Sequence, residues 1–279
     1  MNLSQIIRLV SIFTFFCVFL CSEVASVNAE TPTDLKVTDV RDQSAVVSWT
    51  TDGVEDGYVE YAKQKNSTCS DIPVWMQASD IRASPTVNSY PSSVHYVQIT
   101  GLSATSTFCF RARSGSTVGA VSTFETNTDL KRDSILFDGP LTFGTATGDD
   151  LPELIVRMTF SSSSGTSATV TDLIKNGEGG YFNLDLSSVR TSSGAALFEV
   201  KSLPAAPVTV SVEVLGGSKG KGSTSFVMPS AGNLYGVPIS VVPYDPTSAA
   251  LSTVARTGAS QRISGGAQSF TATFSKPVY

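Results

Sequence analysis

The sequence predicts an all-β protein built from two antiparallel β-sandwich domains in series after a signal peptide. Short runs that alternate apolar and polar residues recur along the chain and are separated by Gly, Pro, Asn and Ser. This pattern is typical of half-buried strands joined by turns. The 279 residues are 41% hydrophobic and 15% charged. Such a chain is too apolar to be disordered and long enough for two domains.

The charge balance argues against a nucleic-acid partner. Asp and Glu number 24 against 19 Lys and Arg, and no cluster of basic residues occurs in the sequence. Binding to a phosphate backbone depends on such a basic surface. His95 is the sole histidine, which excludes sites that need several imidazoles.

Residues 1–29 have the features of a secretory signal peptide. Arg8 precedes an apolar run of 13 residues that ends at Cys21, and small residues surround a cleavage site after Ala29. A helix of that length extends about 20 Å and cannot cross a hydrocarbon layer of about 30 Å. We therefore expect a secreted or cell-surface protein with no transmembrane segment in the mature chain. The alternative is a lipoprotein signal with Cys21 lipidated, although Leu20 stands where a small residue is preferred.

Cleavage after residue 29 leaves Cys69 and Cys109 as the only cysteines of the mature chain. Two cysteines in an exported protein suggest one disulfide. The alternative is a pair of free thiols. Zinc would lack ligands, because two sulfurs and one distant histidine do not complete a tetrahedral site.

The first domain is expected over residues 30–130. Trp49 lies on the same predicted strand face as Ala45 and Val47, which places it in the core. Alternation and turn residues predict strands at 35–40, 45–50, 58–61, 94–99, 107–112 and 121–124.

Residues 31–128 resemble a fibronectin type III module. The resemblance rests on the stretches VVSW, GYVEY and ITGLSATSTFCFRAR. Ala104 replaces the proline and Phe108 the tyrosine of the family pattern, so the corner hydrogen bond of that tyrosine is not expected. The resemblance implies a β-sandwich of seven short strands.

The connection over residues 62–93 is unusually long for a compact domain. If the phenylalanines on either side of Cys109 face the core, Cys109 points away from it. A bridge to Cys69 would then hold this insertion over the outer face of the sheet. Trp75 is expected to cover that flank.

The second domain is expected over residues 131–245, with strands at 154–160, 168–174, 181–186, 208–214, 225–227 and 238–242. The stretches ELIVRMTF and GGYFNLDL resemble the carboxypeptidase regulatory-like or prealbumin-like modules of bacterial surface proteins. Residues 246–279 contain few large apolar side chains and predict a flexible tail. Within it, residues 268–274 alternate. We expect them to form a strand that adds to a sheet edge and links copies head to tail.

Neither a catalytic motif nor a cofactor motif occurs in the sequence. His95 is expected to pack within the sandwich. Asp149, Asp150 and Glu153 resemble a calcium loop only weakly, since an acidic turn is usually solvated. We therefore expect no enzyme activity, no catalytic residues, no cofactor and no metal site.

An export signal together with interaction-type folds indicates a non-catalytic spacer or adhesive module with protein or glycan partners at the cell surface. Fold alone does not specify function. One alternative is a carbohydrate-binding accessory protein, for which Trp75, Tyr90 and Tyr96 are the candidate ligand contacts. Another is the non-catalytic part of a larger exported hydrolase.

Overall fold

The computed structural model describes residues 31–243 apart from 66, 71, 85, 87 and 230–233, and the backbone of 251–257 and 269–274. The signal peptide predicted at 1–29 and the lipidation alternative at Cys21 lie outside the described residues. The described residues form β-strands and three short 3-10 helices. The all-β prediction is confirmed.

The first sandwich is organised around one long strand that belongs to both of its sheets. The first half of β2 pairs with β1 and β4, and its second half pairs with β3 and β5, all antiparallel. A register shift between Thr50 and Glu55 marks the place where β2 leaves one sheet for the other. The fibronectin type III resemblance implies such an antiparallel sandwich. The strands are β1 (Thr33–Thr38), β2 (Ser44–Lys63), β3 (Met76–Ser79), β4 (Pro91–Thr100), β5 (Thr107–Ser114), β6 (Thr117–Val118) and β7 (Ser122–Glu125).

Trp49 occupies the core of the first sandwich, as the alternation predicts. Its side chain is fully buried, and its indole Nε1 donates to the Ser114 hydroxyl at 2.9 Å. The ring stacks on His95 with 4.8 Å between centroids. Burial lowers the pKa of His95 to about 4. The sole histidine is thus a neutral core residue at physiological pH.

The second sandwich has one sheet in the order β11-β10-β14-β15, with β12 also on β10, and another in the order β13-β8-β16. β16 pairs parallel with β8, so the expectation of a wholly antiparallel sandwich is wrong for this pair. The sequence did not predict β8, because Asp138, Gly139 and Pro140 are residue types typical of a turn, although burial alternates along the strand. The strands are β8 (Leu136–Phe143), β9 (Ala146–Thr147), β10 (Leu154–Ser162), β11 (Gly165–Thr166), β12 (Val170–Ile174), β13 (Tyr181–Asp185), β14 (Thr209–Leu215), β15 (Lys221–Val227) and β16 (Ile239–Val241).

The tail contains a strand pair. β17 (Leu251–Thr257) and β18 (Ser269–Phe274) are antiparallel to each other. The strand expected over residues 268–274 is therefore present. The sequence predicts a flexible tail over residues 251–257, whereas these residues form the partner strand.

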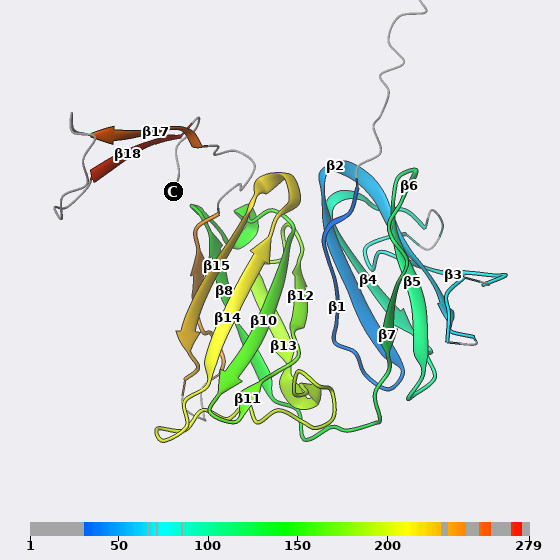
Figure 1. The fold of residues 1–279 in the computed structure, drawn as a ribbon. Helices are drawn as coiled ribbons and strands as arrows, with labels where there is room; N and C mark the ends of the chain where they lie inside the picture. The colour runs from blue at the N-terminus through cyan, green and yellow to red at the C-terminus, as the bar shows by residue number, and fades with distance from the viewer. Residues whose placement is uncertain are drawn as a thin grey trace, which may run out of the picture.

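The two sandwiches lie side by side and contact each other through sheet faces (Figure 1). Each has its own apolar core, one within residues 45–124 and the other within residues 137–241. A third apolar cluster lies between them and joins Val94 of β4 with Ile155, Leu173 and Leu215, with Tyr96 packed against it. Strands β4 and β10 are therefore covered on both faces. This explains why Leu154–Met158 is continuously buried rather than alternating.

Candidate functional site at the junction of the sandwiches

Arg157 forms the polar centre of the contact between the sandwiches. It points outward from β10 and is 4% exposed. Its guanidinium donates to the Ser48 carbonyl at 3.0 Å, to the Ser48 hydroxyl at 2.9 Å and to the Asp34 carbonyl at 2.7 Å. Glu213 lies 3.4 Å away on the neighbouring strand β14. A charged side chain of the second sandwich thus satisfies buried acceptors of the first.

A second polar network joins Glu153, which lies just before β10, to the long insertion of the first sandwich. Its carboxylate accepts hydrogen bonds from Ser92 at 2.9 Å and from the Tyr90 hydroxyl. It also pairs with Arg82 at 2.7 Å, and Arg82 pairs in turn with Asp80 at 2.7 Å. The insertion therefore supplies much of the charge at the junction.

The same insertion also covers the opposite face of the first sandwich. The Arg111 guanidinium carbon of β5 lies 4.6 Å from the centre of the Trp75 ring. The structure contains the expected disulfide between Cys69 and Cys109, with 5.8 Å between their Cα atoms. Cys109 belongs to β5 and is fully buried. Trp75, which belongs to this insertion, therefore lies where the sequence predicted, on the outer flank of the sheet.

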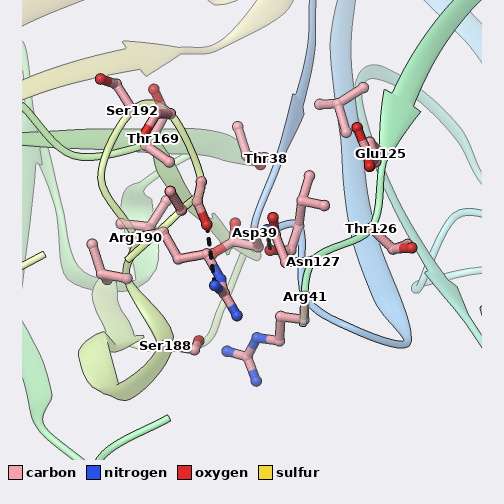
Figure 2. A pocket seen from close by; sticks show the side chains of 18 of the residues that line it. Thr38, Asp39, Arg41, Glu125, Thr126, Asn127, Thr169, Ser188, Arg190 and Ser192 are labelled. Carbon is pink, nitrogen blue, oxygen red and sulfur yellow. Dashed lines mark hydrogen bonds between the residues drawn. The ribbon is translucent and has the colours of Figure 1, made fainter. Parts of the chain in front are cut away.

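A cavity of about 540 Å³ opens at one end of the junction and is lined by both sandwiches (Figure 2). Its floor includes Asp39, whose carboxylate accepts a hydrogen bond from the Thr171 backbone N–H at 2.8 Å. Burial raises the pKa of Asp39 to about 7. Asp39 also has a positive φ of 48°, which is uncommon outside glycine. The carboxyl group is thus held against the second sandwich by the Thr171 backbone N–H.

The candidate ligand contacts of the sequence lie in two different places. Tyr90 and Tyr96 are at the junction, where the Tyr90 ring lies 4.4 Å from the Arg82 guanidinium carbon and the Tyr96 hydroxyl donates to the Thr171 carbonyl at 3.3 Å. Trp75 is on the far side of the first sandwich. The structure does not gather the three aromatic residues into one site.

The acidic residues of the turn before β10, Asp149 and Glu153, also take part in different contacts. Asp149 accepts from the Gly179 backbone N–H at 2.9 Å, whereas the Glu153 carboxylate belongs to the junction network. Within the described residues, no group of His, Cys, Asp and Glu is arranged to hold a metal ion. No helix of that part of the chain is long and apolar enough to span a membrane.

Sequence reasoning missed the residues that make the junction. Arg157 interrupts an otherwise apolar strand, and a charge inside such a run was the signal that could have identified it. Asp39 and Arg190 had no comparable signal. Their significance depends on contacts with residues far away in the chain.

No protein family model matches this chain, and no curated protein sequence matches it. Among solved structures, the FN1–FN3 domains of chicken CNTN1 are 11% identical, with 80% of this chain and 71% of that chain covered and a TM-score of 0.26. A two-domain fibronectin type III segment of chicken tenascin is 11% identical, with 72% and 100% covered and a TM-score of 0.22. PhoD is also 11% identical, with 43% of this chain but only 24% of PhoD covered and a TM-score of 0.29. Such low TM-scores assign neither a family nor a function.

Proposed function

We propose that this protein is a non-catalytic, exported interaction module in which two β-sandwiches form one rigid spacer. The proposal takes the two domains with the boundaries that the sequence predicts, residues 30–130 and 131–245. The observation that carries the proposal is the sheet-to-sheet junction. A flexible string of modules would leave the facing sheet surfaces polar and solvated, whereas here they are apolar at Val94 and Ile155 and cross-bonded at Arg157.

The rigidity follows from the number of polar contacts that cross the junction together. If the buried Arg157 guanidinium moved away from its acceptors, it would lose its hydrogen bonds to Ser48 and Asp34. Those acceptors would also lose their donor. Lys221 adds a pair with Asp34 at 3.1 Å at the edge of the same contact. Separating the sandwiches would break these contacts together, so we expect a fixed angle between the modules.

The test is ¹⁵N relaxation of the purified protein, with Gly217→Ala as the variant that disturbs the junction. Gly217 begins the 3-10 helix η3 (Gly217–Lys219), and a Cβ there would lie 2.4 Å from the Ser93 carbonyl oxygen of the first sandwich. Gly148→Ala is the matched control. It begins η1 (Gly148–Asp150) with a φ of +59° against +56°, and a Cβ there would meet nothing within 4 Å.

The wild type and Gly148→Ala should each tumble with one rotational correlation time across both sandwiches. Gly217→Ala should give two shorter correlation times while each sandwich keeps its own amide spectrum. Two correlation times in the wild type would overturn the rigid-spacer proposal.

Carbohydrate binding remains a proposal for Trp75, because the other two aromatic candidates are used at the junction. One face of the Trp75 ring is occupied by Arg111. A glycan array probed with wild type and Trp75→Ala tests it. Binding that disappears in the variant supports a sugar platform, and binding to no glycan contradicts it.

Self-association through the tail is also a proposal. β17 and β18 pair with each other, so copies would be linked through an outer edge of this hairpin and not through a lone strand. Light scattering of the chain with and without residues 246–279 tests it. Concentration-dependent association that requires the tail is the expected result.

A further inference from the structure

Two arginines that form no ion pair with a described carboxylate line the junction cavity. Arg190 is 4% exposed, and Arg41 is exposed. None of the ion pairs between described residues includes either one. Figure 2 shows both guanidinium groups at the same end of the cavity, and both also line the adjoining depression.

Arg190 is held in place by backbone carbonyls rather than by charge. It donates to the Gly194 carbonyl at 3.1 Å and to the Thr128 carbonyl, while its buried Nε has no hydrogen-bond partner. Burial lowers the pKa of Arg190, and the more distant Asp42 and Asp129 act in the opposite direction. A buried cation without an adjacent anion is unusual, because desolvation is normally offset by a paired charge.

The remaining wall offers hydroxyl groups. Thr169, Ser188 and Ser192 line the cavity from the second sandwich. Among the described residues, the hydroxyls of Ser188 and Ser192 form no hydrogen bond, and neither residue is fully buried. A cavity of about 540 Å³ is within the range of small-molecule sites.

We propose that this cavity binds an acidic sugar, with the ligand carboxylate at Arg41 and the sugar hydroxyls at the serines and threonine of the wall. Guanidinium groups bind carboxylates through two parallel hydrogen bonds, and Arg41 is the exposed member of the pair. The buried charge of Arg190 makes the local potential positive without itself reaching the ligand. A neutral sugar would gain the hydroxyl contacts but would leave this charge unbalanced.

The two cavity carboxyls do not cancel this charge. Burial raises the pKa of Asp39 to about 7, so this carboxyl is largely protonated below pH 7 and carries little negative charge there. Glu125 lies on the opposite wall from Arg190 in Figure 2. A rigid junction needs no ligand, so this binding role is additional to the spacer role. The cavity also lies apart from Trp75.

The probe is D-glucuronate, titrated into the ¹⁵N-labelled protein, with D-glucose and acetate as partial analogues. Glucuronate should shift amides around residues 39–41 and 188–194 and bind at least 10-fold more tightly than either analogue. Arg41→Gln should weaken glucuronate at least 10-fold. Arg113→Gln, on the far face of the first sandwich, is the matched control and should leave the affinity unchanged.

Four results would overturn the proposal. Equal binding of glucuronate and glucose would remove the role of charge, and equal binding of acetate would remove the role of the hydroxyls. An unchanged affinity in Arg41→Gln would place the ligand elsewhere. No binding of glucuronate would also reject the site. If the relaxation experiment then still gave a single correlation time, the rigid-spacer proposal would stand, so the two proposals can fail separately.

Discussion

Each of the two sheets of the first sandwich has an outer face. The two outer faces are covered in different ways. On β4, the outward residues Val94 and Tyr96 lie against the second sandwich. On β5, the outward residues are Cys109, Arg111 and Arg113, covered by the insertion and by a single carboxylate, Glu60. The β4 face is covered by a sheet of the second sandwich, and the β5 face is covered by the long insertion.

The difference shows what each cover requires from the chain. A sheet that packs on a sheet must present apolar residues outward and give most of the polar groups it buries a partner, as the terminal nitrogens of Arg157 do for the Ser48 carbonyl and hydroxyl. A loop cover can tolerate exposed charge, and Arg111 and Arg113 are each about one-quarter exposed at 25% and 22%. We therefore expect substitutions on the junction face to cost more than those on the loop-covered face, except where the disulfide is involved.

The largest effect is expected from removing the disulfide that holds the loop cover. Cys69 and Cys109 are 40 residues apart in sequence. On the chain-entropy model, closing such a loop contributes about 4 kcal/mol by restricting the unfolded chain. The double substitution of both cysteines by Ser should lower the free energy of unfolding by about that amount in urea titrations. Intact-mass analysis of the unreduced protein should show no alkylation, and two added groups would contradict the bond.

The next largest effect is expected at the junction. Arg157→Ala leaves the Ser48 and Asp34 carbonyls buried without their donor, which should cost about 3 kcal/mol. Arg113→Ala is the matched change on the loop-covered face, where its pair with Glu60 is partly solvated. That substitution should cost less than about 1 kcal/mol. Equal losses in the two variants would show that the two faces do not differ as the structure indicates.

A smaller effect is expected from pH. Burial raises the pKa of Asp39 to about 7 in the folded protein, above its ordinary value of 3.8. The folded state then retains a proton that the unfolded chain releases, so stability falls as pH rises from about 4 to 7 and levels off above that range. Because Asp39 borders an open cavity, we expect about 1 kcal/mol between pH 5 and pH 8.

Asp39→Asn isolates this contribution. The amide does not titrate, so the melting temperature of the variant should depend less on pH than that of the wild type. Asp172, whose pKa burial raises to about 6, acts in the same direction and remains in both proteins. A steeper pH dependence in Asp39→Asn would contradict the assignment.

The smallest effect is expected at Trp75. Its ring contact with Arg111 is at a partly exposed position, where such cation–π pairs contribute about 0.5–1 kcal/mol. Trp75→Ala should therefore lower stability by about 1 kcal/mol or less in the same urea titrations. A loss as large as that of Arg157→Ala would mean that the insertion is integral to the core.

The sequence could predict features that depend on the local alternation of apolar residues, such as core positions. It could also predict features that depend on export from the cytoplasm, such as a disulfide. The alternation around Trp49 placed this residue in the core, and two cysteines remaining after the predicted signal identified the Cys69–Cys109 bond. It could not predict β8, because Gly139 and Pro140 are residues typical of a turn. This strand exists because its backbone pairs with β13 and β16, which are distant in sequence. Trp75 was placed correctly on the outer flank, whereas the junction roles of Tyr90 and Tyr96 were not anticipated.

The sequence by itself therefore determined that the chain is all-β, which residues alternate into which core and which cysteines are bonded. These properties follow from a period of two along a strand and from the count of thiols. Only the tertiary structure decided that the outer faces of β4 and β10 meet, that Arg157 and Glu153 are junction residues, and that Arg41 and Arg190 share a cavity. A strand pattern shows which side chains point outward, but it does not show which surface they pack against. That surface can be distant in the chain: Tyr90 and Glu153, which bond across the junction, are more than 60 residues apart.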